Sequence, residues 1–135
     1  MATTDRPAPE PDRAPCPCGR GDSYGDCCGP LHRGERRAPS AEALMRSRYT
    51  AFAIGDAGHL VRSWHPSTAP EHVDLDPEEQ WDRLEIVATT GGGPFDSEGT
   101  VTFRAHHHRG GRAGVLAEHS RFVREDGRWL YLDGS

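Results

Sequence analysis

Four cysteines near the N-terminus constrain the fold more than any other feature of the sequence. They are arranged as Cys-x-Cys and, after eight intervening residues, Cys-Cys, and the chain has no others. Thiolates are soft ligands, and four of them complete the tetrahedral coordination of zinc without leaving a position for water. Glycines in the intervening loop supply the backbone angles that such a tight turn needs. The sequence therefore predicts a closed, structural metal site formed by Cys16, Cys18, Cys27 and Cys28.

The alternative is a pair of disulfide bonds, as in small secreted domains. The first fifteen residues consist mostly of Pro, Ala, Asp and Arg and contain no apolar run of the kind that a signal peptide needs. Thiols that stay in the cytoplasm stay reduced, and clustered reduced thiols favour a metal. We therefore expect a cytoplasmic protein with zinc as its cofactor. The sequence does not separate zinc from iron.

Several segments resemble known families. CPCGRGDSYGDCCG resembles the SEC-C metal-binding motif, named after the C-terminus of the SecA preprotein translocase. The remaining chain resembles the YchJ-like family, through LMRSRYTAF (44–52), WHPST (64–68) and EHSRFVREDGRWLYLDG (118–134). The resemblance implies a SEC-C segment followed by a nuclear-transport-factor-2-like α+β domain, with helices packed on a curved antiparallel sheet. It also implies contacts with a partner protein or the ribosome, with which SEC-C segments are associated.

The chain departs from the motif where the motif commonly carries lysines. The residues at these positions are Asp22, Ser23, Gly25 and Asp26. A basic surface for an acidic partner is thus missing from the motif itself, unless nearby arginines replace it: Arg20, Arg33, Arg36 and Arg37.

Composition and the resemblance together divide the chain into four segments. We expect a disordered tail over residues 1–15, because its proline and charge content leaves no core to bury. The SEC-C motif follows over residues 16–29, then a linker over 30–39 and the α+β domain over 40–135. The basic cluster of the linker either contacts an anion or is simply solvated.

Helix signals begin at Ser40, which is a suitable N-cap. Apolar residues then recur at helical spacing up to Phe52, and Gly55 provides a C-terminal stop. Asp56 can cap a second helix, which we expect to end at His65 because a proline follows.

A third helix start is predicted at residues 76–79, with an aspartate cap, a proline at the first helical position and a glutamate at the third. Such a short helix would bring Trp81 inward.

Beyond residue 84 the apolar residues alternate with polar ones, which is the period of β-strands. Glycines at 91–93, the turn at 109–112 and the Asp126-Gly127 hairpin signal divide this region into four strands. One face of the second strand is formed by Val101, Phe103 and Ala105. Helices followed by a four-stranded antiparallel meander predict an α+β fold in which the first helix covers the sheet.

A pocket between helices and sheet is the usual ligand site of such a layout. Glu118, Ser120 and Phe122 share one face of the third strand, whereas His119, Arg121 and Val123 share the other. The candidate pocket residues are Tyr49, Trp64, His65, Glu118, Arg121 and Asp133. Glu118 could serve as a general acid or base, or the polar residues could form a network that fixes the helices to the sheet.

Three consecutive histidines, His106 to His108, suggest a metal at first sight. In a strand only His106 and His108 point the same way, and no acid lies nearby at suitable spacing. We interpret them as part of an exposed edge strand.

The formal net charge of −5 disfavours binding to nucleic acid and to anionic membranes, and no run is long and apolar enough to cross a membrane. Two classes of function remain. One is a non-enzymatic binding or adaptor module that uses the SEC-C site for macromolecular contacts. The other is a small-molecule-binding protein, or an enzyme of hydrolase or isomerase type, that uses the pocket of the domain. No nucleophile–base pair is evident in the sequence, which favours the first class.

Overall fold

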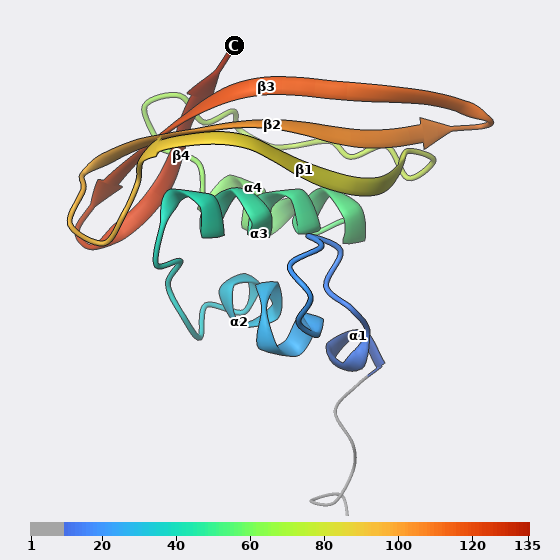
Figure 1. Cartoon of the computed structure of the whole chain (residues 1–135), viewed down its shortest axis with the longest axis horizontal. Coiled ribbons are helices and arrows are strands. Elements are labelled where there is room, and N and C mark those ends of the chain that lie inside the picture. The colour runs from blue at the N-terminus through green and yellow to red at the C-terminus, as the bar shows by residue number, and fades with distance from the viewer. Residues whose placement is uncertain (1–9) are drawn as a thin grey trace, which may run out of the picture.

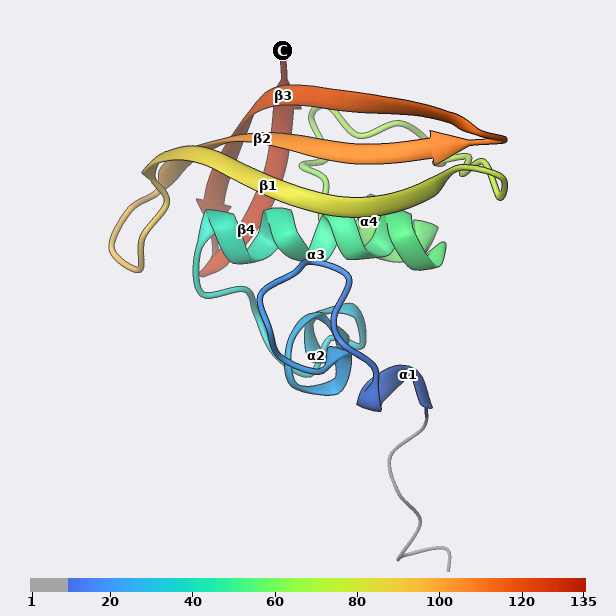
Figure 2. The same ribbon diagram turned by 45° about the vertical axis from the view of Figure 1, so that its right-hand side comes forward.

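The computed structural model describes residues 10–135 and has an α+β fold (Figure 1). One antiparallel sheet contains four strands in sequence order: β1 (Gln80–Gly91), β2 (Glu98–Arg109), β3 (Arg112–Glu125) and β4 (Arg128–Gly134). The sheet is curved, and α3 (Ala41–Ile54) lies along its inner face (Figure 2). The predicted fold class, a meander covered by the first long helix, is confirmed.

Two-residue turns connect β2 to β3 and β3 to β4. Gly110 and Gly111 have φ of 55° and 83°, and Asp126 and Gly127 have φ of 53° and 76°. Two successive left-handed residues give a turn whose twist matches that of the flanking strands, which fixes the register of each hairpin. The turn signals in the sequence therefore located both hairpins correctly.

Helix α3 begins and ends where its sequence signals lie. The Ser40 Oγ accepts a hydrogen bond of 3.1 Å from the amide of Ala43, and Gly55 ends the helix with a left-handed φ of 85°. Leu44 and Met45 of α3 are buried, together with the β2 residues predicted to share one face. Phe122 of β3 and Trp129 of β4 complete this core and are only 1% and 2% exposed.

Helix α4 (Ala57–Arg62) is capped by Asp56, whose carboxylate accepts from the amide of His59 at 3.0 Å. It ends earlier than the expected His65. The reason is tertiary: the amide of His65 donates to the carbonyl of Tyr131 at 2.8 Å, and residue 64 forms a β-bridge with residue 131. Pairing with β4 thus draws the chain out of the helix before the proline.

The predicted helix at residues 76–79 does not form. The Asp76 carboxylate accepts from the amide of Glu78 at 2.9 Å, but this contact closes only a turn. β1 begins at Gln80, and Trp81 pairs with His107 of β2. Strand pairing over twelve residues of β1 overrides a four-residue helix signal.

The interpretation of the three histidines as part of an edge strand is also wrong, because β2 lies between β1 and β3. Each histidine has an acidic neighbour on β1 or just before it. His106 lies 3.4 Å from Glu85, and His108 lies 2.9 Å from Asp82. His107 lies 3.1 Å from Glu79. These acids lie on β1 or directly before it, more than twenty positions from the histidines in the sequence. Sequence spacing therefore did not indicate the contacts.

Residues 10–39, which we call the arm, pack against the side of α3 that faces away from the sheet (Figures 1 and 2). The arm contains α1 (Glu10–Arg13), the 3-10 helix η2 (Tyr24–Asp26) and α2 (Cys28–His32). Residues 1–9 of the expected disordered tail lie outside the described residues, whereas residues 10–13 form α1. Asp12 explains this difference, because its carboxylate pairs with Arg33 at 3.1 Å. The expected linker contains the last turn of α2.

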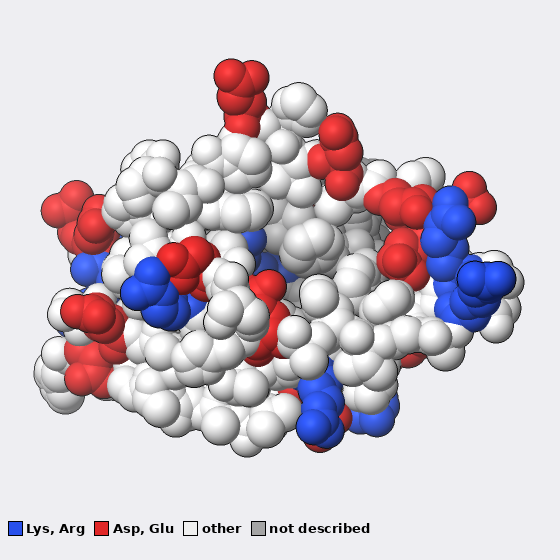
Figure 3. Space-filling model, turned by 90° about the horizontal axis from the view of Figure 1, so that it is seen from above, with Lys and Arg blue, Asp and Glu red and all other residues white. Residues whose placement is uncertain are grey.

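No described helix has the length and apolar character that crossing a membrane would require. The outer side of the sheet, seen in Figure 3, carries acidic and basic side chains next to one another around its edge. That face therefore presents mixed charge instead of a field of one sign.

Replacing Ser40 by Ala removes the side-chain acceptor at the start of α3. We expect Ser40→Ala to lower the free energy of unfolding by about 1 kcal/mol, the usual value of an N-cap. Urea denaturation of both proteins measures this difference. Ser40→Asp keeps an acceptor and should stay within a few tenths of a kcal/mol of wild type; an equal loss in both variants would contradict the capping role.

Candidate metal centre

The first cysteine pair lies on a loop closed by backbone hydrogen bonds. The amide of Cys16 donates to the carbonyl of Asp22 at 2.9 Å, and the amide of Gly19 donates to the carbonyl of Cys16 at 3.1 Å. Gly19 and Gly21 have φ of 78° and 105°, which side chains other than glycine rarely adopt. The loop thus turns back at Cys18 and directs both sulfurs to one side.

The second pair lies where η2 passes into α2. The amide of Cys27 donates to the carbonyl of Tyr24 at 3.1 Å, and Cys28 begins α2. Gly29 permits this tight connection: a Cβ atom there would lie 2.8 Å from the carbonyl oxygen of Tyr24. The connection brings two adjacent sulfurs against the pair on the loop.

The four sulfurs converge on one point, all within 4.8 Å of one another. Cys18 Sγ lies 3.6 Å from Cys27 Sγ, which in turn lies 4.0 Å from Cys28 Sγ. Zinc–sulfur bonds of about 2.3 Å in a tetrahedron require sulfur–sulfur distances of about 3.8 Å. All four thiols are free, and three are buried: Cys16, Cys18 and Cys28. The cluster therefore fits a tetrahedral metal ion closed off from solvent.

Protonation of the thiols competes with metal binding. Burial, followed by the neighbouring Cys18 sulfur, raises the pKa of the Cys27 thiol to about 12. The Cys16 and Cys18 sulfurs, together with burial, raise the pKa of Cys28. Crowded thiolates repel one another, so only a bound cation makes four of them stable together. A metal ion must consequently displace protons when it binds.

Helix α3 contacts the motif through side chains on the face that it turns toward the arm. The Arg46 guanidinium donates to the carbonyl of Cys18 at 2.8 Å and also pairs with Glu42 at 3.0 Å. The Thr50 hydroxyl lies 3.6 Å from Cys16 Sγ and is fully buried. Arg46 and Thr50 lie one turn apart on the same helix face, so the cysteine loop is fixed to the domain.

A buried hydrogen-bond network joins the arm to α3 and α4. His32 Nε2 lies 2.8 Å from the Ser47 carbonyl and donates to it, so Nδ1 accepts from the Tyr24 hydroxyl at 2.8 Å. The Ser47 hydroxyl donates to the carbonyl of Leu44 at 2.7 Å and therefore accepts from His59 Nε2 at 2.9 Å. The sequence carries no signal for this network, because its members are single polar residues far apart in the chain.

Three of the six candidate pocket residues lie on the inner side of the domain. Glu118 faces α3 with Ser120 and Phe122, and its carboxylate accepts from the hydroxyls of Ser120 at 2.6 Å and Tyr131 at 2.9 Å. Trp64 packs edge-on against Tyr131, with ring centroids 5.1 Å apart. Tyr49 lies further along α3, where its ring meets Trp81 and burial raises its pKa to about 12.

Arg48 organises this inner cluster. Its guanidinium stacks on the rings of Tyr131 and Trp64, at 4.3 and 5.0 Å from their centroids. It also donates to the carbonyl of Leu60 and the hydroxyl of Ser63. Burial lowers its pKa to about 10, which leaves it charged at neutral pH. The cluster thus fixes α3 to β4, although the Nε1 atom of Trp64 is buried without a hydrogen-bond partner.

The remaining candidates lie elsewhere. Arg121 and Asp133 form an ion pair with two hydrogen bonds on the outer face of the sheet, whereas Glu118 lies on the inner face. His65 Nε2 lies 2.8 Å from Glu125, and its Nδ1 accepts from the amide of Ser67 at 3.0 Å. The six residues therefore do not line one common cavity, and the alternation along β3 is the reason.

Comparison with known proteins agrees with this architecture. The family described as "YchJ, middle NTF2-like domain" matches residues 40–134, and the SEC-C motif matches residues 13–30. A UPF0225 protein of Streptomyces coelicolor is 57% identical over 120 residues, which cover 89% of this chain and 94% of the relative. The chain belongs to the UPF0225 family. A UPF0225 protein of Deinococcus radiodurans is 45% identical over 125 residues, covering 93% and 92% of the two chains.

Solved structures show the same fold. The solution structure of a SEC-C motif containing protein from Rhodopseudomonas palustris matches with a TM-score of 0.78 and 38% identity, covering 89% of this chain and 96% of that one. The crystal structure of a SEC-C motif containing protein from Psychrobacter arcticus matches with a TM-score of 0.76 and 28% identity, covering 91% and 82%. The combination of arm and sheet is thus shared with these two SEC-C motif containing proteins.

Metal affinity should depend on pH. Because binding displaces protons from the Cys27 and Cys28 thiols, whose pKa values are raised, we expect the affinity for zinc to fall by at least about tenfold for each unit of pH below neutrality. Competition with a chelator of known affinity at pH 6, 7 and 8 measures this dependence. An affinity unchanged across that range would contradict binding by the cysteine thiolates.

The buried histidines predict loss of stability in acid. Burial, followed by the charge of His32, lowers the pKa of His59 from 6.5 to about 3, with Arg48 and Arg62 acting in the same direction and Asp56 opposing them. The unfolded chain then binds more protons than the folded one between these two values. The free energy of unfolding should fall by up to about 1.4 kcal/mol for each pH unit below 6.5.

Urea denaturation from pH 7 to pH 5 measures this slope. A His59→Gln variant should show a shallower dependence on pH, whereas the exposed His72, changed to Gln, should leave the slope as in wild type. Equal slopes in wild type and His59→Gln would contradict the assignment.

Proposed function

We propose that this protein is a non-enzymatic binding module, in which zinc held by the four cysteines orders the arm for contact with a macromolecular partner. The observation that carries the proposal is the convergence of four mostly buried sulfurs on a segment that is itself hydrogen-bonded to α3. A metal with four thiolate ligands has no open position for substrate and acts structurally. Zinc is the metal expected of such a site, in a cytoplasmic setting that keeps thiols reduced.

The surface that the metal would order is the outer side of the arm. Residues 19–21 of the motif and 33–37 after α2 are exposed, and they include Arg20, Arg33 and Arg36. Two of these arginines, Arg20 and Arg36, border a hollow at the edge of the arm together with Ala43 and Arg46 of α3. They compensate for the acidic residues within the motif, which suits a partner protein or the ribosome as the binding target.

The alternative, an enzyme or small-molecule carrier that uses the pocket between helices and sheet, is weaker. Glu118 has two hydroxyl donors, and the Arg48 guanidinium is held by two rings, a carbonyl and a hydroxyl. A catalytic acid or base needs access to a substrate, whereas this cluster is occupied by contacts within the protein. The polar network fixes the helices to the sheet.

The test combines metal analysis with partner binding. Elemental analysis of the untagged protein should give about one zinc per chain, and the Cys27→Ser/Cys28→Ser variant should contain none. Purified ribosomes and affinity capture from the source cytoplasm then serve as partner assays for both proteins. Circular dichroism confirms that the sheet and α3 remain folded in the variant.

We expect binding that is retained by wild type and lost by the variant. Arg20→Glu, which keeps all metal ligands, should weaken the same interaction while leaving the zinc content unchanged. Absence of metal from wild type, or partner binding that does not respond to either variant, would overturn the proposal.

A further inference from the structure

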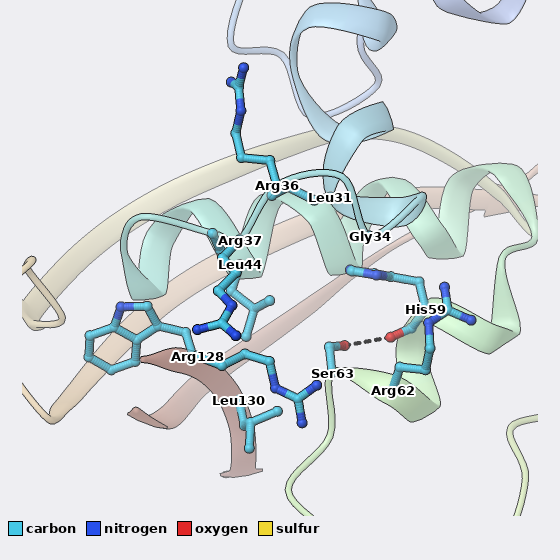
Figure 4. Close-up of a pocket in the computed structure, with 12 residues that line it drawn as sticks. Leu31, Gly34, Arg36, Arg37, Leu44, His59, Arg62, Ser63, Arg128 and Leu130 are labelled. Carbon is cyan, nitrogen blue, oxygen red and sulfur yellow. Dashed lines mark hydrogen bonds between the residues drawn. The ribbon is translucent and has the colours of Figure 1, made fainter. Parts of the chain in front are cut away.

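A cavity lies where the arm meets the domain, away from the candidate pocket residues. Its volume is about 270 Å³. Residues 31–38 of the arm, α4 with its C-cap and the beginning of β4 line it, together with Leu44 of α3 (Figure 4). The cavity therefore exists only while the arm is docked on the domain.

Four arginines and no acidic residue line this cavity. Arg37 comes from the arm, Arg62 from α4 and Arg128 from β4, and all three are exposed. In Figure 4 the side chains of Arg37 and Arg128 extend into the space beside Ser63, whereas the head of Arg36 points away toward α2. Three positive charges from distant parts of the sequence thus surround one hollow.

These arginines lack the carboxylate partners that neutralise others in the protein. Arg37 donates one hydrogen bond of 3.0 Å to the carbonyl of Asp126, and Arg62 donates one of 3.0 Å to the carbonyl of His32. The Arg128 side chain has no hydrogen bond or ion pair within residues 10–135, although its backbone pairs with Glu125 of β3. By contrast, Arg33, Arg109 and Arg121 each form an ion pair. A guanidinium has five N–H donors, so most donors around the cavity are free.

We propose that this cavity is a binding site for a small molecule that carries a phosphate or diphosphate group. Arginine suits that chemistry because its planar fork binds phosphate oxygens through two parallel hydrogen bonds. Leu44, Trp129 and Leu130 also line the cavity and form its apolar floor, although each is at most 5% exposed.

The size and charge of the protein favour a small ligand over RNA. A strand of RNA needs a basic groove that follows its backbone and aromatic platforms for its bases. The basic residues here surround a single hollow, on a chain whose formal net charge is −5. A compact dianion or trianion matches a local cluster of three guanidinium groups without requiring an extended basic surface.

The site also connects the metal centre to ligand binding. The arm wall of the cavity starts at Leu31, three residues after Cys28, in the helix that begins at that metal ligand. Loss of metal should therefore weaken ligand binding through disorder of Arg37. This inference does not depend on a macromolecular partner: a failure of ribosome binding would leave it standing.

Isothermal titration of the full chain with sodium pyrophosphate, at fixed ionic strength, tests the proposal. We expect Arg37→Gln and Arg128→Gln each to weaken binding by about tenfold or more, as expected for loss of a charge-assisted contact. Arg112→Gln is the matched control, because it makes the same change of charge at the exposed start of β3. The control should bind as wild type, and Cys27→Ser should bind more weakly.

Three results would overturn the site. The first is no binding of pyrophosphate by wild type, and the second is equal affinity in Arg37→Gln, Arg128→Gln and Arg112→Gln. The third is tighter binding of a single-stranded RNA oligonucleotide than of pyrophosphate with the same dependence on Arg37 and Arg128, which would replace the small ligand by RNA. Unchanged affinity in Cys27→Ser would contradict the contribution of the arm. Thermal melting and measurement of zinc content verify that each arginine variant is folded and contains zinc.

Discussion

The burial of α3 on two sides is the constraint on which the rest of the structure depends. Its apolar residues, such as Leu44 and Met45, belong to the core with the sheet, while Ser47 and Thr50 are buried beneath the arm. Water is excluded from both sides, so the polar side needs partners from the arm. His32 and the cysteine loop supply them. The metal segment and the α+β domain consequently share one continuous core.

This shared core changes how the metal centre should be understood. A zinc loop on a flexible linker would order only itself, whereas here the loop is bonded to Arg46 and positions the chain that runs on to Arg37. The cysteine cluster, the hydrogen-bonded histidines and the arginine-lined cavity thus form one structural unit on one side of α3. The inner cluster around Arg48 lies on the other side and serves the packing of α3 on β4.

Sequence reasoning succeeded where a few neighbouring residues decide the structure. The cap at Ser40, the stop at Gly55 and the Asp126-Gly127 turn act within one turn of chain, and the cysteine spacing closes a loop of thirteen residues from Cys16 to Cys28. Sequence reasoning failed where a distant strand competes. β2 pairs with Trp81 and excludes the expected helix, and β4 draws His65 out of α4. The arginine cavity joins residues nearly a hundred positions apart, which no local pattern encodes.

The order of the elements along the chain has a consequence for biosynthesis. The cysteines emerge from the ribosome first and can enclose a metal at once, because their loop is local. The helix that supports them follows, and the strands that cover the other side of that helix come last. Long-range pairing is the slow part of folding. The nascent chain should therefore display an arm that can bind metal before the sheet exists. The surface of α3 on which the arm docks is completed only when the sheet covers the other side of the helix.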